Sequence, residues 1–162
     1  MTSFLKFMAS TGLVLGLFAT PAAAITQDYR TLSQSLLSQA QAALAEEQTE
    51  KASELVNLAL TADPSSAQAF VVKARVQAKT GDAEEALRLV TIGLDIEPAD
   101  LSALVFQAEL AVEVKRFEQA DLALTHYVKI CGNACDAADN LAALIEAQRS
   151  DAADDKDETQ KD

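Results

Sequence analysis

The chain has little of what catalytic sites are made from. Its 162 residues include one histidine, five glycines and no tryptophan. The glycines form no phosphate-binding loop, and no pair of acidic residues stands out as a general acid with its base. A lone histidine such as His126 is more simply a partly buried side chain of a helix. The sequence therefore predicts no enzyme, no cofactor and no metal site.

Basic residues are scarce as well. The chain has 13 lysines and arginines against 25 aspartates and glutamates, which gives a formal net charge of −12. Nucleic acids bind to basic surfaces, so this balance argues against a nucleic-acid partner. It also disfavours anionic membrane surfaces. The 49% of hydrophobic residues, with few aromatics among them, predicts one folded domain of ordinary size.

Long apolar runs are missing except near the beginning, and the run there is shorter than the roughly 20 residues of a membrane-spanning helix. It follows Lys6 and leads to Ala22 and Ala24, which are spaced as a cleavage signal of small residues. Residues 1–24 are therefore predicted to be a secretory signal peptide cut after Ala24, with an uncleaved membrane anchor as the alternative. No cysteine follows the run, so a lipid anchor is not expected. Export to an oxidising compartment follows, most simply a bacterial periplasm and otherwise the outside of the cell.

The other end of the chain has no large apolar residue at all. From Ser150 to Asp162 the sequence is rich in acidic residues and cannot bury enough surface to offset its ordering entropy. Residues 150–162 are therefore predicted to be a disordered, solubilising tail.

Proline is rare, and two of the three prolines, Pro64 and Pro98, are 34 residues apart. This spacing predicts internal repeats of 34 residues. The same spacing relates five sets of small or apolar residues: Ala40, Ala74, Ala108 and Ala142; Ala52, Ala86 and Ala120; Leu36, Phe70 and Leu104; Val56, Val90 and Leu124; and Leu60, Leu94 and Val128.

Each repeat is predicted to form two amphipathic helices, because apolar residues recur at helical spacing on both sides of a short polar turn. In the second repeat, Gly81 can adopt the left-handed conformation that ends a helix, and Asp82 can cap the next one. Pro98 then stops the second helix. The repeated alanines suit helices that cross closely, where only a small side chain fits.

This pattern resembles the tetratricopeptide repeat (TPR), a helix-turn-helix unit of 34 residues with small residues at two helix crossings and a proline near its end. The resemblance implies an all-α fold, a right-handed α-solenoid of helix-turn-helix repeats with a C-terminal capping helix. The repeat domain would cover residues 25–149, with units at 33–66, 67–100 and 101–134 and the cap helix at 135–149. The first unit departs from the pattern at Glu46 to Gln48, where a glycine is expected, and the third has Gly132 in place of the proline. An RNA-binding helical repeat of 35 residues is the nearest rival, and the acidic charge speaks against it.

Both cysteines, Cys131 and Cys135, fall in the turn before the cap helix. A thioredoxin-type pair would have two residues between the thiols rather than three, and a zinc site would need two more ligands where only His126 is near. In an exported chain a disulfide is favoured, with free thiols and metal or redox chemistry as alternatives. Closing a loop of five residues gains about 2 kcal/mol in the chain-entropy estimate.

The cap helix has apolar Leu141, Leu144 and Ile145 at helical spacing. Repeat arrays need such a helix because the last unit otherwise exposes its apolar face. The alternative is that Leu144 and Ile145 contact another protein.

The resemblance also implies where a ligand would bind, because similar proteins hold extended peptides or partner helices in a concave groove lined by the first helix of each repeat. Leu37, Val71 and Val105 would form its apolar floor unless neighbouring segments cover them. Arg75 could meet a carboxylate, and Glu109 or Glu113 a basic group. The lysines and asparagines that clamp a C-terminal carboxylate are missing, which favours an internal segment. The predicted groove residues are Gln34, Leu37, Gln41, Gln68, Val71, Arg75, Ser102, Val105, Glu109 and Glu113.

Taken together, these features predict an exported, monomeric adaptor that binds a protein or peptide partner in its groove, in the assembly of a cell-envelope complex. The alternative is a structural subunit that oligomerises through its repeat ends.

Overall fold

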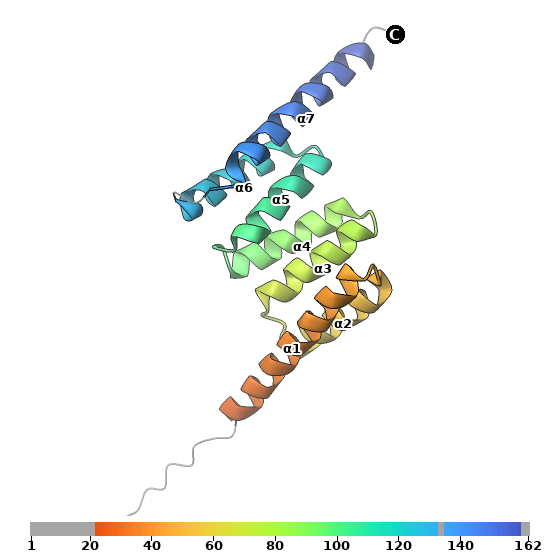
Figure 1. Cartoon of the computed structure of the whole chain (residues 1–162), viewed down its shortest axis with the longest axis vertical. Helices are drawn as coiled ribbons and strands as arrows, with labels where there is room; N and C mark the ends of the chain where they lie inside the picture. Colours follow the sequence, from red (N-terminus) through yellow and green to blue (C-terminus); the bar gives the residue numbers. More distant parts are fainter. Residues whose placement is uncertain (1–21, 133–134, 160–162) are drawn as a thin grey trace, which may run out of the picture.

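The computed structural model describes residues 22–132 and 135–159, and Figure 1 shows the arrangement of the helices. These residues form seven helices and no strand: α1 (Ala22–Ala45), α2 (Thr49–Ala62), α3 (Ala67–Lys79), α4 (Ala83–Ile96), α5 (Leu101–Glu113), α6 (Phe117–Cys131) and α7 (Ala138–Thr159). Three helical hairpins, α1–α2, α3–α4 and α5–α6, follow one another along the long axis, and α7 covers the last of them. The predicted all-α solenoid of repeats is confirmed.

The turn inside each hairpin has the same backbone shape whether or not it contains glycine. Gly81 has φ +84°, as predicted, and Asp82 accepts a hydrogen bond from the Glu85 N–H at 3.1 Å as the N-cap of α4. Glu47 and Lys115 occupy the equivalent positions of the other two hairpins, and both have φ +59°. The geometry of the repeat therefore places Glu47 and Lys115 in the left-handed conformation, which residues with a side chain rarely adopt.

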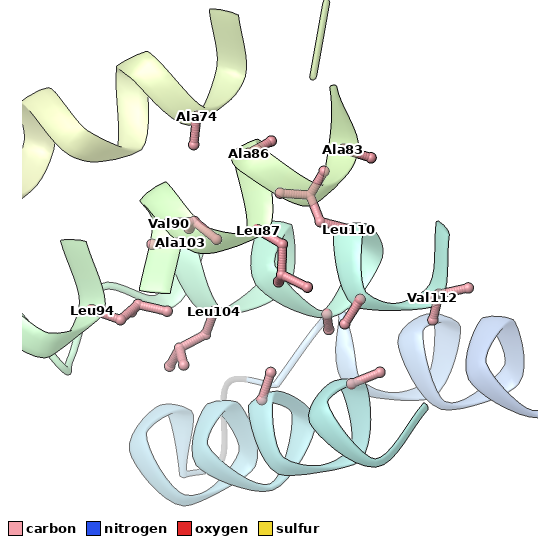
Figure 2. Packing of buried hydrophobic residues seen from close by; sticks show 14 of the residues in the cluster. Ala74, Ala83, Ala86, Leu87, Val90, Leu94, Ala103, Leu104, Leu110 and Val112 are labelled. Atoms are coloured by element: carbon pink, nitrogen blue, oxygen red, sulfur yellow. The ribbon is translucent and has the colours of Figure 1, made fainter. Parts of the chain in front are cut away.

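The repeated alanines lie where the helices cross. Ala40, Ala74 and Ala108 on the first helices have no exposed surface, and neither do their counterparts Ala52, Ala86 and Ala120 on the second helices. In Figure 2, Ala74 points from α3 toward Ala86 of α4. Gly93 continues this pattern, because a Cβ at that position would lie 2.9 Å from Val71 Cγ2 and 3.1 Å from the Ala67 carbonyl oxygen.

The buried side chains form two clusters that meet at α3. One cluster joins α1, α2 and α3 through residues such as Leu37, Val56 and Val72. The other extends from α3 to α7 and includes Leu87 and Leu104. Helix α3 contributes to both, since successive side chains on it pack into different clusters: Val71 belongs to the larger cluster and Val72 to the one shared with α1 and α2.

The last junction, between α6 and α7, is built differently from the others. Tyr127 takes the position that Gly93 has in the second unit, and its hydroxyl oxygen accepts a hydrogen bond from the Ala137 N–H at 3.3 Å. Gly132 ends α6 with φ +62°. The disulfide expected between Cys131 and Cys135 is present, with 5.3 Å between the two Cα atoms. A side-chain hydrogen bond and a disulfide therefore fix the turn in which Gly132 stands at the repeat's proline position.

Helix α7 packs on α6 as a cap would. Leu141 and Ile145 are buried, whereas Leu144 is 39% exposed. Arg149 lies over the ring of Phe117, 5.7 Å from its centroid, and forms an ion pair with Asp121 at 2.6 Å. The helix begins at Ala138, three residues later than predicted, because the disulfide-closed turn includes Cys135.

The acidic end of the chain differs from its prediction. Residues 150–159 continue α7 as helix instead of forming a disordered tail, and Figure 1 shows this part extending past the other helices. The anchored first turns of α7 provide the nucleus, so each further residue adds a hydrogen bond without a new nucleation cost.

The predicted signal peptide lies mostly outside the described residues, which begin at Ala22. Helix α1 starts there, before the predicted cleavage after Ala24. Cleavage and export therefore stay predictions. Within residues 22–132 and 135–159, none of the helices combines the length and apolar character that a bilayer crossing requires.

Candidate functional site

Helices α1, α3 and α5, the first helices of the three hairpins, share one side of the array, and we call their outward surface the groove face. All seven polar residues predicted for this surface are exposed: Gln34, Gln41, Gln68, Arg75, Ser102, Glu109 and Glu113. None of these side chains forms an ion pair or side-chain hydrogen bond with another described residue, apart from the Ser102 hydroxyl, which donates to Asp100 Oδ1. They are available to a ligand.

The predicted apolar floor is not an open surface. Leu37 is 2% exposed and Val71 is 6% exposed, and only Val105 is half-buried. Val71 packs against Gly93 of α4, where the missing side chain lets α3 and α4 approach. Leu37 and Val71 therefore belong to the core, and a ligand would meet the next turn of these helices instead.

A hollow of about 360 Å³ lies at that next turn. We call it the Arg75 hollow; it brings together residues of all three groove-face helices, namely Leu44 and Ala45 of α1, Arg75, Ala78 and Lys79 of α3, and Phe106 of α5. The Arg75 guanidinium carbon lies 4.7 Å from the centroid of the Phe106 ring. This cation–π contact keeps the guanidinium beside the Phe106 ring at the wall of the hollow, with its donors still unused by other described residues.

Sequence reasoning found only Arg75 among the six residues of this hollow. Four of the others could have been found by continuing one turn further along the predicted faces of α1 and α3. Ala45 and Lys79 share the repeat position of Glu113, which was predicted. Phe106 had no such signal, because its counterparts in the other units are Ser38 and Val72.

The groove face changes sign from one helix to the next. Helix α3 presents Arg75 and Lys79 on this face and contains no acidic residue, although the whole chain has a net charge of −12. Helix α5 contains Glu109 and Glu113 and no basic residue. A positive strip in the middle of the face thus borders a negative one.

This arrangement offers contacts to a ligand rather than groups for a reaction. The polar groups of the Arg75 hollow are one guanidinium and one ammonium, with no nucleophile or base beside them. Within the described ranges, no three histidine, cysteine or acidic side chains are close enough to hold a metal ion.

The fold has counterparts among solved structures, whereas no family model and no curated protein matches the sequence. One similar structure is the Yersinia enterocolitica type III secretion chaperone SycD with a peptide of the translocator YopD. It shares 14% identity over 73% of this chain and 92% of that one, with a TM-score of 0.64. A second is the Sgt2 TPR domain from Aspergillus fumigatus, with 19% identity over 76% and 81% of the two chains and a TM-score of 0.65.

A third is the TPR2B domain of yeast Sti1 in its pHsp70 complex, with 15% identity over 79% and 98% of the two chains and a TM-score of 0.60. The chain has a TPR-like fold. At these identities the likeness is one of fold, so the ligands of this TPR-like protein have to be inferred from its own residues.

Proposed function

We propose that this TPR-like protein is a non-enzymatic adaptor that holds a segment of a partner protein on its groove face. The observation that carries the proposal is the Arg75 hollow, where all three groove-face helices meet around exposed and unpaired cationic groups. The fold neighbours support it, since SycD holds a peptide of YopD and the Sti1 domain is in complex with pHsp70.

The hollow defines the chemistry of the segment. Leu44, Ala78 and the Phe106 ring can cover an apolar side chain, while Arg75 and Lys79 attract a carboxylate beside it. Glu109 and Glu113 continue the groove face on α5 and attract a basic residue further along. An extended segment with an acidic and apolar pair at one end and a basic residue at the other fits this order of charges.

Replacement of Arg75 by glutamate tests the proposal. Arg75 is exposed, so we expect Arg75→Glu to keep the helicity of the wild type while losing capture of the partner from a native envelope extract. Lys129→Glu is the matched control, because it makes the same charge change on exposed α6, away from the groove face. A partner retained by folded Arg75→Glu and also by Phe106→Ala would exclude the Arg75 hollow as its site.

We also propose that the adaptor works in the periplasm, in the assembly of an envelope complex. The support is the signal-like start of the sequence and the paired cysteines, which suit an oxidising compartment. Mass spectrometry of the mature protein checks this, since we expect its N-terminus at Ile25. A mature protein that retains Met1 would contradict export by this route.

The second candidate function is a structural subunit that oligomerises through the ends of its repeat array. Its support is the first part of α1, where Tyr29 is 53% and Leu32 48% exposed. Size-exclusion chromatography with light scattering separates the two functions, because the adaptor is expected to be a monomer. A Leu32→Lys variant that dissociates an observed oligomer would favour the structural subunit.

A further inference from the structure

A second cleft lies away from the groove face, between the second helices of the last two hairpins. This α4–α6 cleft has a volume of about 370 Å³. Its floor is apolar, formed by Leu94 of α4, Leu104 of α5 and Ala123 of α6. Figure 2 shows Leu94 and Leu104 together at one end of the buried cluster. Leu122 stands at the wall and is 62% exposed, more than any other large apolar side chain in the described part of the chain.

The cleft also contains a polar group whose orientation is fixed. Gln107 Nε2 donates a hydrogen bond to Thr91 Oγ1 at 2.9 Å, and that hydroxyl donates to the Leu87 carbonyl oxygen at 2.8 Å. Because the Thr91 hydroxyl gives its proton to Leu87, it can only accept from Gln107. The amide nitrogen of Gln107 therefore faces Thr91, and its carbonyl oxygen is left as an acceptor beside the cleft.

In the described part of the chain, Asp95 is the one carboxylate that lines the cleft, and His126 of α6 lines it as well. Asp95 lies at its edge, exposed, and makes no ion pair or side-chain hydrogen bond with any described residue. No lysine or arginine lines the cleft. Arg88, nearly two turns before Asp95 on α4, is already paired with Glu85. The cleft thus combines an apolar floor with a carboxylate and a carbonyl oxygen, both of which accept hydrogen bonds.

We propose that the α4–α6 cleft binds the basic side chain of a protein segment in which a lysine or arginine is flanked by apolar residues. The methylene stem of that side chain packs on Leu94 and Leu104, and its cationic head pairs with Asp95 and the Gln107 carbonyl oxygen. Leu122 covers a flanking apolar residue. This site is separate from the Arg75 hollow, so one chain can hold two segments on two faces.

Blocked heptapeptides titrated into the full-length protein test the site. The probe Ser-Ala-Leu-Lys-Leu-Ala-Ser is compared with versions that have norleucine or glutamate in place of lysine, by NMR of the Gln107 side-chain amide and the Leu122 methyls. We expect saturable shifts with the lysine peptide, binding at least tenfold weaker with the norleucine peptide, and none with the glutamate peptide. Asp95→Asn should lower the affinity for the lysine peptide to that of the wild type for the norleucine peptide. Leu122→Ala should weaken the binding of both the lysine and the norleucine peptide.

Asp28→Asn on α1 is the matched control and should leave the shifts unchanged. Three results would each overturn the proposal: no saturable shift at Gln107 and Leu122, equal binding of the lysine and norleucine peptides, or an Asp95→Asn variant that binds like the wild type. Shifts at Phe106 instead would assign the peptide to the groove face and would likewise overturn it, without bearing on the Arg75→Glu experiment.

Discussion

Glu47 and Lys115 hold a conformation that glycine holds at the corresponding turn of the second unit. Each has φ +59°, where a side chain brings Cβ close to the backbone at a cost of about 1–2 kcal/mol. Packing of the hairpins keeps them there, because any other turn would separate the two helices at their crossing. At these two positions the folded protein would be more stable with a residue that adopts the left-handed conformation without strain.

Glu47→Gly and Lys115→Gly are expected to stabilise the protein. Relief of the left-handed strain outweighs the greater flexibility that glycine gives the unfolded chain, which leaves a gain of about 0.5 kcal/mol each. Urea denaturation followed by circular dichroism measures the change. The reverse substitution, Gly81→Ala at φ +84°, should lower the free energy of unfolding by about 1 kcal/mol. If all three variants unfold at the same urea concentration, the turns are not held as described.

Gly93→Ala should destabilise the protein, although alanine is the better helix former by about 1 kcal/mol. The added Cβ would lie 2.9 Å from Cγ2 of buried Val71 and 3.1 Å from the backbone oxygen of Ala67, and neither neighbour can move freely. Overpacking of this kind costs about 1–3 kcal/mol, so we expect a net loss of about 1 kcal/mol.

The partner of that clash can be tested in a double-mutant cycle. Val71→Ala removes Cγ2, so the loss caused by Gly93→Ala should be smaller in the Val71→Ala background than in the wild type. Equal losses in the two backgrounds would assign the strain to the Ala67 oxygen instead.

The sequence predicted the crossing alanines but not which apolar groove residues would be buried. A column of small residues has one physical reason, close helix approach, so its meaning carries over between units. Leu37 and Val71 lie at the border between core and groove, where a small rotation of the helix decides the exposure of a side chain. Helical periodicity identifies a face but does not resolve such a rotation.

At the scale of helices, the α6–α7 junction is the part of the fold that departs most from its repeats. Beside the buried face of α7, its connections are the disulfide, the Tyr127 hydroxyl, and Arg149, which pairs with Asp121 and lies over the Phe117 ring. The ion pair is half-exposed and contributes little, at most about 1 kcal/mol. The disulfide and the buried face of α7 therefore provide most of the attachment.

Replacing both cysteines by serine should lower the stability by about 1–2 kcal/mol, because the bond closes a loop of only five residues. The loss should be local. In native-state hydrogen exchange we expect faster exchange in α7 and the end of α6, with unchanged rates in α2 and α3. Faster exchange throughout the array would show that the cap supports the whole domain and not only its end.

The number and order of helices followed from the 34-residue spacing, and their lengths at the two ends did not. Helices α2 to α6 are bounded on both sides by turns that recur at the 34-residue spacing, and Gly81, Asp82 and Pro98 mark these turns in the second unit. Helix α1 starts before the first repeat and α7 continues past the last, where no neighbouring unit limits them. The end of α7 also lacks the apolar residues that identify a packed helix, so periodicity gave no signal there.

At the scale of the whole molecule, the net charge of −12 acts against the folded state, because folding brings like charges together. The acidic end of α7 adds to this charge while Figure 1 shows it extending away from the other helices. We expect the melting temperature to rise by several degrees between 20 and 300 mM NaCl, as the Debye length falls to a few ångströms.

Removal of residues 154–162 tests the contribution of that end. The truncated protein should melt within a few degrees of the full chain at 300 mM NaCl, and its salt dependence should be smaller. A truncated protein that melts much lower at both salt concentrations would show that the acidic end packs on the domain.

Helix α3 belongs to both buried clusters, and this makes it the seam along which the array can come apart. A pulling force on the N-terminus would peel α1 and α2 from α3 as one piece and leave the larger cluster intact. The Arg75 hollow lies across this seam, with Leu44 on one side and Phe106 on the other. A bound segment would contact both sides of this seam, so occupancy of the groove should raise the force needed to separate α1 and α2 from α3.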